Sequence, residues 1–186
     1  AGLRSAISAA QDTSVHVAVI CKSLLGKAHT VMAEGGVAAA LAHVDGEDNW
    51  KVHFRDTLKG GKLLNNWRMA EIHAKESPEC VRELEKWGAV FDRTEKGDIN
   101  QRPFGGHTYA RLAHVGDRTG LEMLRTLQDH AIPQGIDVFM EHTVIQLFTH
   151  KNQITGLLCY SRASGEFIVF SAKAVVLATG GCARCF

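Results

Sequence analysis

The sequence has little of several features that mark particular classes of protein. Its 186 residues include only 3 prolines, 7% are aromatic, and 21 Lys and Arg residues offset 20 Asp and Glu residues. With 45% apolar residues, this composition is typical of a globular chain and excludes disordered and fibrous proteins. Because the net charge is only +1 and no run of basic residues is present, nucleic acid is not expected as a partner.

Paired cysteines, metal-ligand patterns and long apolar runs are also missing. The 5 cysteines are an odd number, and four of them lie in segments expected to be core or turn, namely Cys21, Cys80, Cys159 and Cys182. We therefore expect reduced thiols. Cys182 and Cys185 form a Cys-x-x-Cys pattern, but no second pair lies at zinc-binding spacing and no His-x-x-x-His occurs, so no metal site is expected. No apolar run approaches the roughly 20 residues of a membrane helix, and no signal peptide opens the sequence.

The first residues predict part of a nucleotide-binding unit. Residues 1–11 carry apolar side chains at helical spacing, and Val15–Ile20 predicts a strand. A helix that opens with Gly2 and leads to a strand is what a βαβ nucleotide-binding unit retains without its first strand and first two glycines. Gly2 would let a pyrophosphate approach the positive end of the helix, and an ordinary helix with an N-terminal glycine is the alternative. We therefore expect a fragment of a longer protein.

The segment after this first strand argues against one class of nucleotide-binding enzyme. An NAD site usually has an acidic residue about 20 residues after the glycines, where it holds the ribose hydroxyl. Here the strand is followed by Cys21-Lys22-Ser23. A nicotinamide-dependent enzyme is therefore disfavoured.

The middle of the chain predicts mainly helices. Small residues over Thr30–Leu41 predict a helix, although Gly35 and Gly36 would each weaken it by ~1 kcal/mol. Those glycines indicate either close access to the backbone or tight helix packing, and both interpretations stay open. Further helices are expected at Asn49–Lys59, at Asn66–Lys75, from Ser77-Pro78 to Gly88, and after a capping box of Thr119 and Glu122.

Strands dominate the last third of the chain. Segments rich in Val, Ile and Phe, joined by hairpin turns, predict antiparallel strands at Val138–Phe148, Ile154–Tyr160 and Phe167–Ala178. A shorter hairpin is expected from Ala89–Arg93 and Ile99–Arg102. With the βαβ unit, these strands predict an α/β fold that has a parallel sheet and an antiparallel addition, with no domain boundary inside residues 1–186.

Four motifs together resemble the flavoprotein subunit of succinate dehydrogenase and fumarate reductase. They are His29-Thr30-Val31 leading into Ala33-Glu34-Gly35-Gly36, then Gln101-Arg102-Pro103-Phe104-Gly105-Gly106, then Gly116-Asp117-Arg118-Thr119-Gly120, and finally Ala178-Thr179-Gly180-Gly181. The resemblance covers the whole sequence. It implies one partial, Rossmann-like FAD-binding domain over residues 1–186, whose N-terminal strand and C-terminal capping and helical parts lie outside the sequence.

The resemblance also implies which residues hold FAD. His29 corresponds to the histidine that bonds covalently to the 8α-methyl carbon of FAD, and a neutral imidazole is a competent nucleophile for such a bond. A carboxylate at Glu34 would lower the reduction potential of the flavin. The other implied contacts are Gly2 at the phosphates, Cys21, Lys22 and Ser23 at the ribose, Thr30, Val31, Glu34, Gly35 and Gly36 along the isoalloxazine, Val144 at the adenine, and Ala178, Thr179, Gly180 and Gly181 at the closing turn. Cys21 stands where the family commonly has serine.

Few residues on the substrate side are implied. Phe104 corresponds to an aromatic side chain that lines the dicarboxylate pocket. Without the resemblance, the residues around it would indicate an aromatic side chain of the core. Arg111 faces either an anion or a structural partner. Residues 117–120 are better explained by helix capping than by catalysis. In the family, the proton-transfer arginine lies beyond residue 186, so no catalytic residue is assigned and the fragment alone is not expected to turn over.

The function implied is that of succinate dehydrogenase in the tricarboxylic acid cycle and electron transport. Hydride would pass from succinate to covalently bound FAD, and electrons would then pass through an iron-sulfur subunit to quinone. The alternatives are fumarate reductase running in the opposite direction, L-aspartate oxidase, for which His29 is not expected, and a non-enzymatic nucleotide-binding module. Membrane anchor subunits would hold the protein peripherally at the cytoplasmic face of a bacterial inner membrane, or on the matrix side of a mitochondrial one.

Overall fold

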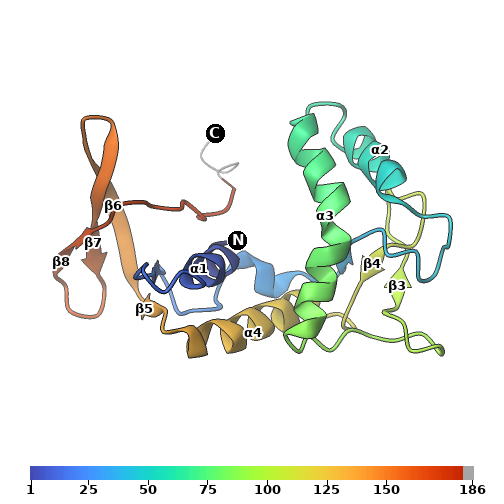
Figure 1. The fold of residues 1–186 in the computed structure, drawn as a ribbon, viewed down its shortest axis with the longest axis horizontal. Helices are drawn as coiled ribbons and strands as arrows, with labels where there is room; N and C mark the ends of the chain where they lie inside the picture. Colours follow the sequence, from blue (N-terminus) through green and yellow to red (C-terminus); the bar gives the residue numbers. More distant parts are fainter. Residues whose placement is uncertain (182–186) are drawn as a thin grey trace. The chain divides into compact units, whose positions relative to one another are not determined.

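The structure is a computed structural model that describes residues 1–181, and the chain divides into two compact units (Figure 1). Unit 1 contains residues 1–27 and those from 127 onward, and unit 2 contains residues 28–126. No helix in the described residues is both long and apolar enough to span a membrane. The assignment of the whole sequence to one partial domain stays a prediction.

Unit 1 contains the helix and the parallel strand pair that the sequence predicts. Helix α1 (Gly2–Ala10) buries one apolar face, and β1 (Ala18–Ile20) pairs in parallel with β5 (Asp137–Phe139). Strand β1 is shorter than expected because residues 12–15 form a turn, in which the Val15 amide donates to the Asp12 carbonyl oxygen. This parallel pair, with the antiparallel sheet that follows it, confirms the predicted α/β class.

The antiparallel addition consists of three strands in chain order. They are β6 (His142–His150), β7 (Gln153–Ser161) and β8 (Phe167–Ser171), and Figure 1 shows β6 and β7 as a long hairpin. The single strand expected over Val138–Phe148 is divided between β5 and β6. Glu141 has a φ of 57° at the division, and such a left-handed residue turns the chain away from its previous direction.

The strand expected to reach Ala178 ends at Ser171. The Ala172 amide still donates to the carbonyl oxygen of Thr155, but no described strand pairs with residues 174–178. The side chains of Val176 and Leu177 are 69% and 67% exposed. Because a strand is defined by a hydrogen-bonded neighbour, this apolar run does not form one among the described residues.

Unit 2 begins with short elements where a helix was expected. A 3₁₀ helix, η1 (His29–Met32), leads to β2 (Val37–Ala38), which pairs with β4 (Leu112–Ala113), and β4 also pairs with β3 (Gln101–Arg102). The predicted helix over Thr30–Leu41 is wrong because Gly36 has a φ of 125°, outside the helical region. A Cβ atom at Gly36 would also lie 2.8 Å from the carbonyl oxygen of Ala113, so the backbones approach there as only glycine allows.

Two helices pack against each other in unit 2 (Figure 1). In α2 (Trp50–Gly60), the first amides are capped by the Asn49 side chain, and in α3 (Trp67–Lys86) the Asn66 side chain caps Met69. The break expected at Ser77 is absent, since α3 continues through Pro78. A proline inside a helix costs about 3 kcal/mol, and the buried face of α3 offsets this cost. That face consists of Ala70, Ala74, Ser77, Val81 and Leu84.

The last helix begins where predicted but is capped differently. In helix α4 (Thr119–Ala131), which is followed by η2 (Ile132–Gln134), the Thr119 hydroxyl donates to the Glu34 carbonyl oxygen and accepts from the Val115 amide. The Glu122 carboxylate accepts from the Val90 amide and pairs with Arg125 instead. The hairpin expected over residues 89–102 is reduced to one bridge between Arg93 and Ile99, because the Val90 amide is bonded to α4.

Candidate cofactor and substrate site

The predicted phosphate-binding residues of unit 1 lie together at the start of α1. A Cβ atom at Gly2 would lie 3.4 Å from the Cβ atom of Ala178, so the first turn of α1 is in contact with the predicted closing turn. Gly180 has a φ of 80° in that turn, a conformation that glycine adopts without strain. The free amides of a helix N-terminus next to a bare glycine fit the phosphates of a dinucleotide.

The predicted ribose residues follow the end of β1. The Cys21 amide donates to the carbonyl oxygen of Phe139 at 2.9 Å, and the Ser23 carbonyl oxygen accepts from the Glu141 amide at 3.2 Å. The Lys22 carbonyl oxygen accepts from Arg162 Nη1 at 3.5 Å. The ribose segment is therefore bonded to the turn before β6, the strand that carries Val144.

Cys21 differs chemically from the serine expected at its position. Burial raises the pKa of the Cys21 thiol, so it stays protonated near neutral pH. A neutral thiol is only a weak hydrogen-bond donor. Any polar contact to a ribose at this position would therefore be weaker than the contact a serine hydroxyl makes.

In unit 2, the predicted attachment residue His29 is the first residue of η1, and its side chain is exposed. Helix α4 packs directly on this short helix. The Gly120 amide donates to the carbonyl oxygen of Ala33 at 2.8 Å, and a Cβ atom at Gly120 would lie 1.8 Å from the carbonyl oxygen of Thr30. From the sequence, Gly120 was expected only to take part in helix capping. The structure shows that Gly120 also permits the close approach of α4 to η1.

Arg102 fixes the backbone of the predicted isoalloxazine segment. Its Nε donates to the Gly35 carbonyl oxygen at 2.8 Å, and its Nη2 donates to the carbonyl oxygen of Glu34. The same guanidinium reaches Gly116, at 3.0 Å from its carbonyl oxygen, and Asp117, at 3.0 Å from Oδ1. Sequence reasoning gave Arg102 no role, although it lies inside the motif that contains Phe104. The Glu34 side chain stays exposed.

Phe104 lies beside this segment and is not a core residue. Its side chain is 58% exposed, and a Cβ atom at Gly35 would lie 3.5 Å from its ring. The structure therefore brings the predicted substrate residue and one predicted flavin residue into contact. Bare glycine backbone beside an exposed aromatic ring fits a flat, conjugated cofactor such as FAD.

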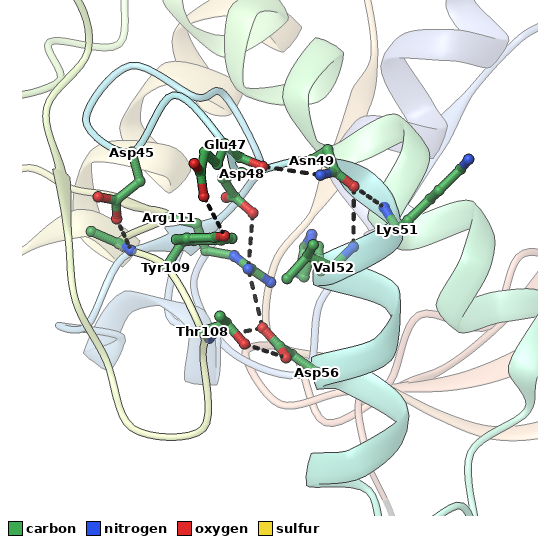
Figure 2. Close-up of polar contacts among 12 residues, drawn as sticks. Asp45, Glu47, Asp48, Asn49, Lys51, Val52, Asp56, Thr108, Tyr109 and Arg111 are labelled. Carbon is green, nitrogen blue, oxygen red and sulfur yellow. Dashed lines mark hydrogen bonds and ion pairs between the residues drawn. The ribbon is translucent and has the colours of Figure 1, made fainter.

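Arg111 has structural partners, which decides between its two interpretations. It is 0% exposed, and its Nη2 lies 2.9 Å from Asp48 Oδ1 and 3.1 Å from Asp56 Oδ2. Figure 2 shows the guanidinium between the loop that carries Asp48 and the helix α2 that carries Asp56. An ion pair enclosed in this way is not available to an external anion.

A buried histidine, His53, lies in the same region. It is 1% exposed and its ring contacts those of His73 and His107. Burial, and then the charge of Arg111, lower the pKa of His53 to about 4. Burial also lowers the pKa of His107. Both imidazoles are therefore neutral at pH 7.

This pKa shift predicts a loss of stability in mild acid. The unfolded chain takes up a proton at His53 near pH 6.5, whereas the folded chain takes it up only near pH 4. His53 therefore contributes stability above pH 6.5 that is lost as the pH falls towards 4. We expect the midpoint of thermal unfolding to fall between pH 6.5 and 5, and to fall less in a His53→Gln variant. If the midpoint of thermal unfolding falls equally with pH in the two proteins, this prediction is wrong.

Two further predictions from the sequence concern the state of the cysteines and metal binding. Cys182 and Cys185 lie outside the described residues. Within residues 1–181, Cys21 and Cys159 are free thiols, and no group of three or more His, Cys, Asp or Glu side chains is arranged to hold a metal ion.

Known proteins are similar to this chain over its full length or nearly so. The FAD binding domain family matches residues 1–186. The chain is 40% identical over 182 residues to a fumarate reductase (CoM/CoB) chain of Methanothermobacter marburgensis, and 38% identical over 194 residues to the succinate dehydrogenase flavoprotein subunit of Rickettsia conorii. These matches cover 97% and 100% of this chain, but 33% and 32% of the relatives. The chain therefore spans about one third of their length.

Solved structures are also similar to this chain over all or nearly all of its length. The Mycobacterium smegmatis Sdh1 complex in the apo form matches with a TM-score of 0.91 and 55% identity, over 96% of this chain and 32% of that chain. An E. coli quinol fumarate reductase matches with a TM-score of 0.91 and 36% identity, over 100% of this chain and 32% of that chain.

Proposed function

Because the chain belongs to the FAD binding domain family, we propose that it is the cofactor-binding part of the flavoprotein subunit of a succinate dehydrogenase. The observation that carries the proposal is the 55% identity over 96% of the chain to a structure of the Sdh1 complex. The geometry supports it in each unit. The glycine at the start of α1 contacts the closing turn, and the exposed His29 precedes a glycine segment beside Phe104.

Each predicted residue has a distinct task in this function. When bound, FAD supplies the hydride acceptor for the oxidation of succinate to fumarate. His29 would form the covalent bond to the 8α-methyl carbon, and η1 presents its imidazole at the surface of unit 2. Arg102 would keep the Glu34 and Gly35 carbonyl groups turned into the protein, and Phe104 would line the dicarboxylate pocket. The group that moves the substrate proton is expected beyond residue 186.

Fumarate reduction is the second candidate function, and one observation favours it. Glu34 places an exposed carboxylate on the proposed isoalloxazine segment. A negative charge beside a flavin disfavours its anionic reduced form and lowers the reduction potential, which suits an enzyme that reduces fumarate. L-aspartate oxidase and a non-enzymatic module are weaker candidates, because neither explains His29.

The proposed partners follow from the whole complexes to which the relatives belong. Related structures are described as Sdh1 in complex with UQ1 and as quinol-fumarate reductase with menaquinol molecules. We propose that the full-length protein transfers electrons through an iron-sulfur subunit to quinone. Membrane anchor subunits would then hold it peripherally, at the cytoplasmic face of a bacterial inner membrane.

The first test of the function is the covalent flavin. Full-length protein is purified, denatured and separated on a gel, and the flavin fluorescence of its band is measured beside that of His29→Ala. We expect a fluorescent wild-type band and a dark variant band, since the variant lacks the attachment nitrogen. His150→Ala is the control, because His150 is also exposed and should keep the fluorescence. A dark wild-type band from protein that had bound flavin would remove His29 as the attachment site and favour L-aspartate oxidase.

A further inference from the structure

Four consecutive residues in unit 2 are each held by a carboxylate from another segment (Figure 2). They are Thr108, held by Asp56, Tyr109, held by Glu47, Ala110, held by Asp45, and Arg111, held by Asp48 and Asp56. The carboxylates come from the loop before α2 and from α2 itself. This segment is therefore fixed at every residue, although it contains no strand before β4.

Asp56 makes the most contacts among these carboxylates. Its Oδ2 accepts from the Thr108 amide at 2.8 Å and its Oδ1 accepts from the Thr108 hydroxyl at 2.8 Å. Its Oδ2 also lies 3.1 Å from Arg111 Nη2. Burial, the largest influence, raises the pKa of Asp56, but the two Thr108 hydrogen bonds and the Arg111 charge outweigh it and lower the pKa overall. Asp56 is therefore an ionised, buried acceptor, and its bonds to Thr108 are charge-assisted.

Thr108 ends the short loop that carries Phe104. Strand β3 ends at Arg102, so only residues 103–107 separate it from Thr108. Gly105 and Gly106 lie in this loop with no atom near enough to restrain an added Cβ. Within the loop, the His107 amide donates to the Phe104 carbonyl oxygen at 3.2 Å. The position of Phe104 therefore depends on where β3 and Thr108 hold the ends of the loop.

We propose that Asp56 is a positioning residue for substrate, which acts through Thr108 to set the position of the Phe104 ring beside Gly35. The proposal rests on the proposed function, in which that ring lines the pocket for a C4 dicarboxylate. Loss of the Thr108 hydroxyl bond leaves the Thr108 amide as the one remaining hydrogen bond from this residue to Asp56, so this end of the loop is held less firmly. The ion pairs of Arg111 with Asp48 and Asp56 stay in place. The expected defect is therefore in dicarboxylate binding, with flavin attachment and folding preserved.

The test compares Thr108→Val with Thr108→Ser in the full-length flavoprotein with its cofactor. Valine keeps the shape of threonine without the hydroxyl, and serine keeps the hydroxyl. The dissociation constant for malonate, a dicarboxylate that the enzyme cannot desaturate, is measured from the change in flavin absorption. KM and kcat for succinate, gel fluorescence and thermal unfolding are measured on the same samples.

We expect Thr108→Val to raise both the malonate dissociation constant and KM about tenfold, because dicarboxylate binding must then order a loop that the hydroxyl no longer holds. Its kcat and covalent flavin should stay near those of the wild type, and Thr108→Ser should bind malonate normally. The unfolding midpoint of Thr108→Val should fall by no more than about 3 °C, because a single hydrogen bond is lost from a long chain. In a Phe104→Ala background, Thr108→Val should have no further effect, because the ring that the loop positions is gone.

Several outcomes would overturn the proposal. Unchanged malonate binding in Thr108→Val would remove the positioning role, and so would a loss of binding that only parallels a loss of flavin or of stability. Equal effects of Thr108→Val with and without Phe104 would show that the anchor does not act through the ring. If wild-type protein neither binds malonate nor oxidises succinate, the proposed function itself fails, and the role of Asp56 in it fails too.

Discussion

Replacing Gly120 with alanine is expected to destabilise the protein by about 3 kcal/mol and to abolish covalent flavin attachment. The added Cβ atom would lie 1.8 Å from the Thr30 carbonyl oxygen and 3.0 Å from the Ala33 side chain. The first of these is a backbone atom, which moves only if η1 or the start of α4 moves. Either movement breaks the hydrogen bond between the Gly120 amide and Ala33 and displaces His29, the first residue of η1.

The measurements are the unfolding midpoint and the gel fluorescence of the full-length protein. For a loss of about 3 kcal/mol in a protein about three times this length, the midpoint should fall by roughly 3 °C. Gly60→Ala is the matched control, because Gly60 ends α2 with no atom within 4 Å of an added Cβ, and alanine is the better helix former. If Gly120→Ala melts and fluoresces like Gly60→Ala, the close approach of α4 to η1 is not needed for attachment.

Features encoded by neighbouring residues could be predicted from the sequence. The helices expected from Asn49 and from Asn66 are present, and each asparagine caps its helix. An N-cap needs only the side chain and the amides two or three residues later. The parallel sheet was predicted from the βαβ pattern at the start of the chain, and the antiparallel addition from segments rich in Val, Ile and Phe joined by hairpin turns. The resemblance to succinate dehydrogenase and fumarate reductase flavoproteins, based on four motifs, is also confirmed by the family match and the similar structures.

The errors occur where distant contacts decide the local structure. Gly36 is held against β4, some 77 residues away in sequence, so local helix propensity did not predict the short elements around it. Burial of one face keeps α3 continuous through Pro78, against the local preference for a new helix start. The run at residues 174–178 has the composition of a strand but no described partner.

The same distinction applies to the candidate site. Motif positions such as His29, Gly35 and Phe104 could be predicted, and their roles in FAD and substrate binding stay predictions. The roles of Arg102 and Asp56 could not be predicted, because their partners lie on other elements. Arg102 bonds Glu34 and Gly35, and Asp56 bonds Thr108. No local sequence pattern identifies an arginine or aspartate whose hydrogen-bond partners are backbone groups far away in the sequence.

Replacing Arg111 with methionine is expected to be among the most destabilising single changes in unit 2. Methionine occupies a similar length without the charge, and it leaves the buried carboxylates of Asp48 and Asp56 without their common partner. Breaking a buried ion pair in this way costs about 3–5 kcal/mol. A full-length Arg111→Met protein should therefore unfold roughly 3–4 °C below the wild type, since its unfolding entropy scales with its length.

An exposed arginine provides the control for Arg111. Arg82→Met removes a surface ion pair with Glu79, in which Arg82 Nη1 and Glu79 Oε2 are 3.7 Å apart, and such pairs contribute at most about 1 kcal/mol.

The loss of stability in Arg111→Met should also shrink as the pH falls, because burial already raises the pKa of Asp48 and a protonated carboxyl no longer needs a cation. If the two variants melt alike, or if acid deepens the defect of Arg111→Met, then the Asp48–Arg111–Asp56 ion pairs do not stabilise this unit.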